Sequence, residues 1–265
     1  MLDGLPYQVK RAIARSLGPF YIHTLGSSCS EWRAMLRPNQ RALSNRRTLP
    51  GAGSGGDYGA FLARFPNAET LCLYRNGRAG GAGFDLAPLG AAGPRIRTLV
   101  LSFCTFRPST FRHIAACGLT SLELETNQMR DVVAMIAPTL GRMGTLVALS
   151  IRNNAIGSSA PELARAIAGL TRLESLRLSH GGLGAPGATA IAPGLSGLTR
   201  LRGLDLSRNS IACDGAAALA TTLRALTALT ELNIDANTIG ARGFAALYSR
   251  GPPGLAGLMR YNPGA

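Results

Sequence analysis

A stretch that repeats at a fixed period constrains this chain more than any other feature of its sequence. In the copy LRGLDLSRNSIACDGAAALATTLRALTA, from Leu201 to Ala228, leucines occupy positions 1, 4 and 6 and an asparagine occupies position 9. From Leu119 onward the copies recur every 27 or 28 residues, and a period of this size predicts a stacked solenoid. The pattern L-x-x-L-x-L-x-x-N begins at Leu119, Leu146, Leu173, Leu201 and Leu229, weaker copies begin at Ala68 and Ile96, and a shortened copy begins at Leu255.

Each copy is expected to form one strand and one helix. The apolar residues at positions 1, 4 and 6 suit a short strand, whereas Ala216, Leu219, Ala220 and Leu223 follow helical spacing. No single copy can bury its leucines, so the copies must stack, with a parallel sheet inside and helices outside. The sequence therefore predicts an α/β horseshoe over residues 67–265. Its strands, at ~4.8 Å spacing, would give an inner arc on the order of 35 Å, long enough to hold a protein partner.

Position 9 of the repeat is predicted to carry a structural ladder. A buried asparagine is costly unless it is hydrogen-bonded, so these amides are expected to satisfy backbone groups where the chain leaves each strand. A ligand-binding role is the alternative, but recurrence with the period favours the structural interpretation. The asparagines are Asn76, Asn127, Asn154, Asn209 and Asn237, and Cys104 and Gly181 replace them in two copies.

The repeats resemble leucine-rich repeats of the ribonuclease-inhibitor-like class. The signature N-x-I-x-x-x-G-A-x-x-L is present at Asn209, Ile211, Gly215, Ala216 and Leu219, and the resemblance extends from about Ala68 to the C-terminus. The string GAAALA, beginning at Gly215, is also similar to the string that names the GALA group of plant-pathogen effector proteins. The second resemblance implies delivery of the protein into a host cell.

Composition excludes a disordered chain and argues against several functions. The hydrophobic content of 46% is ample for a globular core. The net charge of +14 suggests an acidic partner, but 27 of the 28 basic residues are arginines scattered along the chain without interleaved aromatic residues, so nucleic-acid binding is not favoured. The odd number of cysteines, five, indicates reduced thiols. No secretory signal and no membrane-spanning run is visible, so we expect a soluble protein of the cytoplasm or nucleus.

Residues 1–40 lack the repeat and are expected to form a separate helical module. Val9, Ile13 and Leu17 are spaced by four residues, which builds one face of a helix, and Gly18-Pro19 ends that helix. Two more short apolar groups follow before Pro38, so the segment predicts three short helices. About forty residues bury little surface alone, and such a module would need the repeat array or a partner beside it.

This module resembles the F-box in the order and spacing of its residues. In that family the motif binds the small adaptor subunit of a cullin-RING ubiquitin ligase, and a C-terminal repeat array holds the substrate. The resemblance thus implies a substrate-recognition subunit without catalysis of its own. The alternative is a plain helical cap on a leucine-rich-repeat interaction or inhibitor scaffold. The residues that would contact the adaptor are Leu5, Pro6, Val9, Ile13, Leu17, Ile22, Leu25 and Trp32, and Cys29 and Leu36 complete the match.

No constellation for catalysis, cofactor binding or metal binding is evident. Residues 41–66 read as a linker, in which Gly51, Gly53 and Gly56 satisfy G-x-G-x-x-G without a preceding apolar strand. The only lysine, Lys10, is not part of a P-loop, and the histidines form no H-E-x-x-H motif. We therefore expect a protein that is not an enzyme and has no cofactor, metal or small-molecule substrate.

The candidate binding residues are those at positions 3, 5 and 7, which should line the concave face because they alternate with the buried leucines. Their charges come in blocks, acidic, basic and acidic again, which favours a protein partner of mixed charge over a phosphate backbone. The alternative is that they are ordinary solvated side chains of an exposed sheet. The residues chosen are Tyr74, Glu123, Glu125, Arg152, Arg177, Asp205, Glu231, Asp235 and Tyr261.

Overall fold

The chain folds into a solenoid whose strands form one continuous parallel sheet. The computed structural model describes residues 42–44, 68–74, 89, 96–104, 108–127, 132–252, 257 and 259–260. Every strand in this part of the chain pairs only with the strands before and after it, in the order β1 to β9. The strands are β1 (Ala42–Ser44), β2 (Thr70–Tyr74), β3 (Thr98–Ser102), β4 (Ser121–Glu125), β5 (Ala148–Ser150), β6 (Ser175–Arg177), β7 (Gly203–Asp205), β8 (Glu231–Asn233) and β9 (Met259–Arg260).

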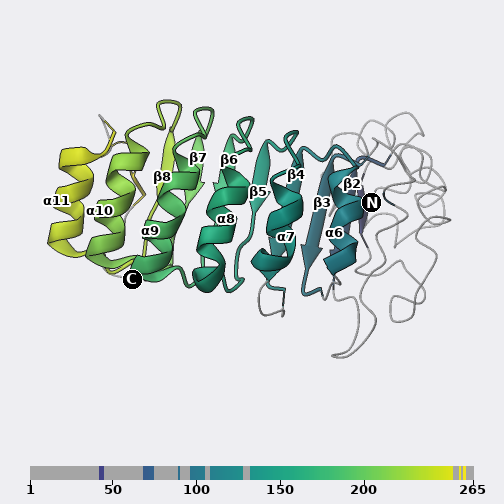
Figure 1. The fold of residues 1–265 in the computed structure, drawn as a ribbon, viewed down its shortest axis with the longest axis horizontal. Coiled ribbons are helices and arrows are strands. Elements are labelled where there is room, and N and C mark those ends of the chain that lie inside the picture. The colour runs from purple at the N-terminus through teal and green to yellow at the C-terminus, as the bar shows by residue number, and fades with distance from the viewer. Residues whose placement is uncertain are drawn as a thin grey trace, which may run out of the picture.

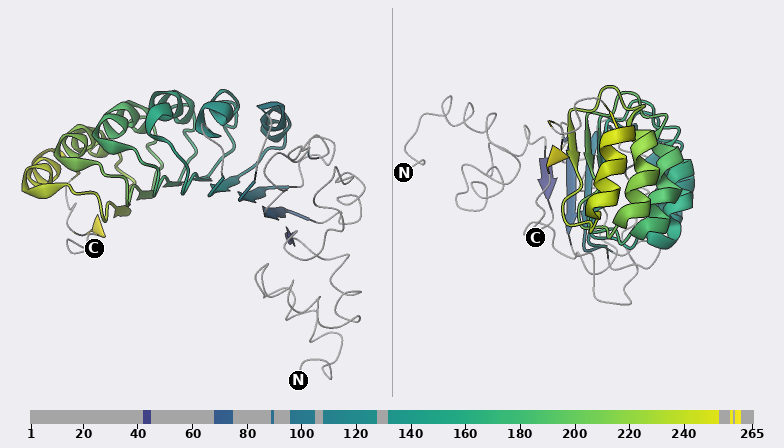
Figure 2. Two further views of the ribbon diagram at one scale, coloured as in Figure 1. Left: turned by 90° about the horizontal axis from the view of Figure 1, so that it is seen from below. Right: turned by 90° about the vertical axis from the view of Figure 1, so that its left-hand side faces the viewer.

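Helices cover one side of this sheet and leave the other side open. Figure 1 shows the helices side by side in front of the strands, and Figure 2 shows them on the outer side of the arc, with the strands on the inner side. The predicted horseshoe is thus confirmed for the described repeats. The helices are α6 (Pro108–Ala115), α7 (Val132–Leu140), α8 (Ala160–Ile167), α9 (Gly184–Leu195), α10 (Ala212–Leu223) and α11 (Gly240–Arg250), and a short 3-10 helix, η2 (Gly157–Ser159), precedes α8.

The leucines of the repeat form the core, as the period predicts. Leu122 of β4 pairs in register with Leu99 and Leu149 on the neighbouring strands, and the same row continues across the sheet. At positions 1, 4 and 6 of the described copies that begin at Ala68 to Leu229, every side chain is 5% exposed or less. Burial of one leucine stabilises a fold by about 1.5–3 kcal/mol, and here each leucine is buried by the copies on both sides of it.

Small residues let consecutive helices approach closely, which explains the Gly-Ala pair of the repeat signature. A Cβ at Gly215 would lie 2.7 Å from Cγ2 of Ile211 and 2.9 Å from Cβ of Ala188 on α9. A Cβ at Gly194 would overlap the backbone of Ala164 on α8, since it would lie 2.7 Å from that residue's Cα. The helices therefore pack at a distance that leaves no room for a Cβ at Gly194 and little at Gly215.

The sheet begins before the first recognised copy, within the stretch expected to be a linker. Residues Ala42–Ser44 form β1, which pairs in parallel with β2 and places Leu43 in register with Leu71. The period runs back to this strand, because Ala42 precedes its partner Thr70 by 28 residues. Gln40 and Asn45 stand at positions 1 and 6 of this copy, so the apolar pattern that reveals the other copies is missing.

The last copy is shifted by one residue relative to the sequence-based alignment. Met259, not Leu258, pairs with Leu232, and Arg260 pairs with Asn233. Met259 therefore takes the register of the core leucines, and Arg260 takes the register expected for Met259. The leucines Leu255 and Leu258 fit positions 1 and 4 of the sequence-based alignment, and only the pairing with β8 reveals the shift. The F-box-like residues 1–40 and Tyr261 lie outside the described residues.

Candidate protein-interaction surface

Strand register arranges the position 5 residues in one line across the concave face. Glu123 pairs with Ser150, Ser150 with Arg177, and Arg177 with Asp205. The line continues through Asn233 on β8 to Arg260 on β9. Because neighbouring parallel strands lie about 4.8 Å apart, these residues follow one another at about that spacing across the sheet. We call this line the central row.

The residues at position 7 form a second line beside the central row. Three of them, Arg152, Ser179 and Ser207, form side-chain hydrogen bonds. Nε of Arg152 donates to Oγ of Ser179 at 3.0 Å, and Nη1 of Arg152 lies 3.9 Å from a carboxylate oxygen of Glu125. Because both charged groups are more than a third exposed, this ion pair contributes little stability. On β7, the carboxylate of Asp205 accepts hydrogen bonds from the amide and the hydroxyl of Ser207, at 3.0 and 2.6 Å. These contacts fix the orientation of Arg152 and Asp205 before any partner arrives.

Glu123 is a partly buried carboxylate at one end of the central row. Partial burial raises the pKa of its carboxyl group, the charge of Glu125 raises it further, and Arg177 and Arg152 lower it. Next to it, Ser150 is only 4% exposed, and its hydroxyl has no hydrogen-bond partner among the residues that the structure describes. The partly buried carboxylate of Glu123 has hydrogen-bonding capacity that a partner can use, whereas the hydroxyl of Ser150 is enclosed.

Most of the predicted binding residues lie on consecutive strands. Seven of them follow one another on β4 to β8 or shortly after those strands: Glu123, Glu125, Arg152, Arg177, Asp205, Glu231 and Asp235. Tyr74 lies at the end of β2, where it pairs with Ser102. The acidic, basic and acidic blocks therefore lie on consecutive strands. Whether this surface binds a partner stays a prediction.

The asparagine ladder is confirmed in the described copies. Oδ1 of Asn237 accepts from the amide of Asn209 at 2.8 Å, and Nδ2 of Asn237 donates to the carbonyl of Leu206 at 2.8 Å. Asn154 and Asn127 make the corresponding bonds three copies and four copies earlier. Each buried amide thus joins its own copy to the preceding one, which accounts for the recurrence of asparagine at position 9.

Cys104 takes the place of an asparagine without breaking the donor side of this ladder. Its thiol lies 3.5 Å from the carbonyl of Leu73. In the next copy, Nδ2 of Asn127 donates to the equivalent carbonyl, that of Leu101. The thiol also contacts the carbonyl of Ser102 at 3.2 Å. A buried thiol is a weaker donor than an amide, so this step of the ladder is the weaker one.

Gly181 interrupts the ladder, and it lies beside a hollow. With no side chain at residue 181, the amide of Asn154 has no acceptor among the described residues, although the carbonyl of Gly181 accepts from the amide of Ile156 at 2.7 Å. A hollow of about 540 Å³ lies here between two copies. It is lined by Asn153, Asn154, Ala155, Gly157, Ser158, His180, Gly181 and Gly182.

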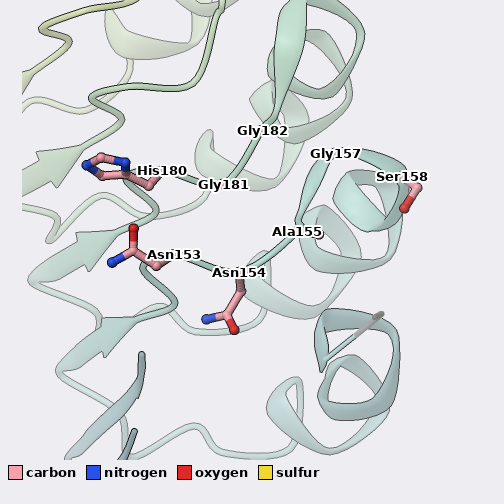
Figure 3. Close-up of a pocket in the computed structure, with 8 residues that line it drawn as sticks. All are labelled: Asn153, Asn154, Ala155, Gly157, Ser158, His180, Gly181 and Gly182. Carbon is pink, nitrogen blue, oxygen red and sulfur yellow. The ribbon is translucent and has the colours of Figure 1, made fainter. Parts of the chain in front are cut away.

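Asn153 and His180 stand at one end of this hollow and were missed by sequence reasoning. Figure 3 shows their side chains on neighbouring copies, both directed away from the helices, whereas Ser158 lies at the opposite end. Both residues occupy position 8, with φ of 53° and 56°, and this left-handed turn recurs at position 8 of the neighbouring copies. The replacement of the ladder asparagine by Gly181 was the one available signal, because position 8 itself varies freely.

Within the described residues, no group of three or more His, Cys, Asp or Glu side chains is placed to hold a metal ion. Among the helices described, none is long and apolar enough to cross a membrane. Burial raises the pKa of the Cys117 thiol, which favours its protonated form.

The described geometry and the sequence comparison together define the class of protein. A family model described as Leucine Rich repeat matches residues 170–192, which cover β6 and the first part of α9. With its consecutive in-register parallel strands and outer helices, the described part of the chain has the architecture of a leucine-rich-repeat solenoid. Proteins of this architecture are mostly interaction scaffolds that present the concave face of the sheet.

Two solved structures are among those to which the chain is similar. One is internalin C2 from Listeria monocytogenes, with 20% identity, a TM-score of 0.47, and coverage of 91% of this chain and 90% of that chain. The other is the leucine-rich repeat-containing protein LegL7 from Legionella pneumophila, with 17% identity, a TM-score of 0.47, and coverage of 87% and 85%. No curated protein matches the sequence.

Proposed function

We propose that this protein is a substrate-recognition subunit of a cullin-RING ubiquitin ligase. In this proposal the repeat array binds a protein substrate through its concave face, and the F-box-like residues 1–40 bind the ligase adaptor. The protein performs no chemistry itself, because its role is to hold the substrate near the catalytic subunits. It acts in the cytoplasm or nucleus, including those of a host cell if it is delivered as an effector.

The observation that carries the substrate-binding half of this proposal is the central row with its flanking charges. The row runs across consecutive strands from Glu123 to Arg260, and its charges change sign along the array. A partner that presents the complementary order of charges is attracted and is also held in one position along the row. A partner with a different order meets like charges. The hydrogen bonds that hold Arg152 and Asp205 reduce the entropy lost on binding.

A second candidate function, an interaction or inhibitor scaffold with a helical cap, is favoured by β1. This strand pairs with β2 directly after residue 41, so the sheet starts immediately behind the F-box-like segment. In this function residues 1–40 would cover the open edge of the first strand, which a solenoid must protect. The two functions differ in whether residues 1–40 bind an adaptor.

Co-purification of the full-length protein with the ligase adaptor separates these functions. We expect the intact chain to retain the adaptor and the double variant Leu5→Ala, Pro6→Ala to lose it. Circular dichroism and urea unfolding should show that the repeats of the variant stay folded. The matched control is Leu2→Ala, a leucine of the same segment that is not part of the F-box match. Failure of the intact chain to bind the adaptor would leave only the scaffold function.

The substrate-binding half has a separate experiment. Proteins captured by the intact chain are identified by mass spectrometry and then tested in purified form against the charge-reversed variant Arg152→Glu, Arg177→Glu. We expect a true partner to lose at least about ten-fold in affinity, because two favourable charges become repulsive. The control is Arg165→Glu, Arg242→Glu on helices α8 and α11. Equal losses for both variants would refute binding by the concave face.

A further inference from the structure

Parallel topology collects the connections between copies on two opposite edges of the solenoid. Each strand is followed by a helix on the outer side, so every helix-to-strand connection returns to the same edge of the sheet (Figure 1). We name the edge where the strands begin the strand-entry edge. In the described part of the chain its connections comprise residues 116–120, 141–147, 168–174, 196–202 and 224–230.

The charge on the strand-entry edge is almost entirely positive. Its connections contain one acidic residue, Glu174, which lies 3.8 Å from Nε of Arg202. The concave face has the opposite balance, since its predicted binding residues include five carboxylates and two arginines. The two surfaces thus differ in sign. The arginines of the five connections are Arg142, Arg172, Arg200, Arg202 and Arg224, and all of them are exposed.

Four of these arginines are available to a partner. The side chains of Arg142, Arg172, Arg200 and Arg224 form no ion pair and no hydrogen bond within the part of the chain that the structure describes. Arg224 caps the end of α10, where the helix dipole favours a cation. That explanation does not extend to Arg172 and Arg200, because the dipole acts within the last turn and both residues lie five residues beyond a helix end.

The shape of this edge suits a flat anionic surface better than a nucleic acid. Copies stack in register, so the short connections form a strip in which several copies can touch one plane at once. The five connections contain no aromatic residue on which bases could stack, and no helix projects from them to enter a groove. A polyanion that wrapped further would also meet the acidic concave face.

We propose that the strand-entry edge docks the protein on a membrane surface rich in anionic lipid. The arginines of successive copies contact lipid phosphate and carboxylate groups, while the sheet stands upright on the bilayer and the concave face stays accessible. This contact uses none of the residues assigned to adaptor or substrate binding. Loss of membrane docking can therefore be distinguished from loss of adaptor or substrate binding.

Vesicle sedimentation of the full-length protein tests the proposal. The probes are vesicles of phosphatidylcholine alone and vesicles that also contain phosphatidylserine. We expect binding only to the second kind, with strong weakening at high salt because the charges are exposed. Each basic residue near such a surface contributes roughly five-fold in partitioning. The triple variant Arg142→Gln, Arg172→Gln, Arg200→Gln should therefore lose on the order of 100-fold.

The matched control removes the same charge from other surfaces. It is the triple variant Arg165→Gln, Arg208→Gln, Arg242→Gln, whose arginines lie on α8, on the opposite edge and on α11. We expect this control to lose less than about five-fold, and circular dichroism should show that both triple variants are folded. Equal losses of vesicle affinity in the two triple variants would refute a specific role of the strand-entry edge. Absence of binding to phosphatidylserine vesicles, or tighter binding of duplex DNA through the same arginines at physiological salt, would overturn the proposal.

Discussion

Each ladder asparagine serves two copies at once. Oδ1 of Asn209 accepts from the amides of Gly181 and Leu183, and its Nδ2 lies within hydrogen-bond distance of the carbonyls of Leu178, Leu206 and Ser207. Because the residue is 1% exposed, none of these groups can turn to water if the side chain is removed. The ladder therefore stabilises the joint between copies as well as the turn within one copy.

Substitution of a ladder asparagine is expected to be strongly destabilising. Asn209→Ala leaves several buried backbone groups without partners, each at a cost of about 1–3 kcal/mol, and we expect a total loss of about 2–4 kcal/mol. Urea unfolding measures this loss. The control Asn233→Ala removes a side chain that accepts one local bond, from the amide of Asp235, and should cost below about 1 kcal/mol. Equal costs would show that the ladder contributes nothing special.

Glu123 makes stability depend on pH. Its pKa is raised above the ordinary value of 4.5, so the folded state favours the protonated carboxyl. That contribution is fully present below the ordinary value and is lost as the pH rises through the raised pKa. Glu123→Gln keeps the shape but cannot ionise. Relative to the unsubstituted protein, we expect the variant to gain stability as the pH rises from about 4.5 to neutrality, by less than about 1 kcal/mol.

Chemical denaturation at several pH values measures this effect. The control is Glu69→Gln, an exposed carboxylate just before β2, which should show a smaller change across the same range. A Glu123→Gln variant that is less stable than the parent at neutral pH would mean that attraction by Arg152 and Arg177 outweighs the cost of burial.

At the scale of helices, close packing reverses the usual effect on stability of replacing a helical glycine by alanine. Inside a helix, replacement of glycine by alanine normally stabilises by roughly 0.5–1 kcal/mol. At Gly194 of α9 the added methyl group would overlap the backbone of Ala164 on α8, and a backbone cannot rotate away. The close α8–α9 seam thus depends on this residue.

We expect Gly194→Ala to destabilise the protein by about 1–3 kcal/mol, the range for overpacked cores. The control is Gly203→Ala on β7, where an added Cβ meets nothing within 4 Å, so its effect on unfolding should be small. Urea midpoints of the two variants give the comparison. A neutral or stabilising Gly194→Ala would show that α8 and α9 separate at little cost.

At the scale of the whole solenoid, Gly181 divides the ladder into two parts. Cys104, Asn127 and Asn154 belong to one part, and Asn209 and Asn237 belong to the other. Backbone bonds still cross the division, since the amide of Asn153 donates to the carbonyl of Ser179 at 3.1 Å. Stability in a repeat protein is carried by such neighbour contacts, so the division marks the weakest joint of the central array.

Hydrogen exchange locates this joint directly. We expect the amide of Asn154 to exchange at least about ten-fold faster than the amides of Asn127 and Asn209, each of which donates to a ladder oxygen. NMR-detected exchange under native conditions measures all of these amides in one experiment. Equal protection would imply that another group, such as a bound water, accepts from the Asn154 amide.

Much of this architecture follows from the period and the residue types. Leucines at positions 1, 4 and 6 can leave water only by stacking, which determines the parallel sheet, the outer helices and the concave placement of Glu123 or Arg177. The buried asparagines likewise require bonds to the backbone, which determines the ladder. The acidic and basic blocks of the concave face were therefore predictable in order.

Where the repeat pattern becomes irregular, only the tertiary structure determines which residues form strands and in which register they pair. The strand at Leu43 and the register of Met259 depend on backbone pairing, which tolerates almost any side chain and leaves little trace in the sequence. The hollow beside Gly181 and the hydrogen bonds that orient Arg152 arise between neighbouring copies. The local pattern determines what each copy must bury, whereas contacts between copies determine which polar groups are left for a partner.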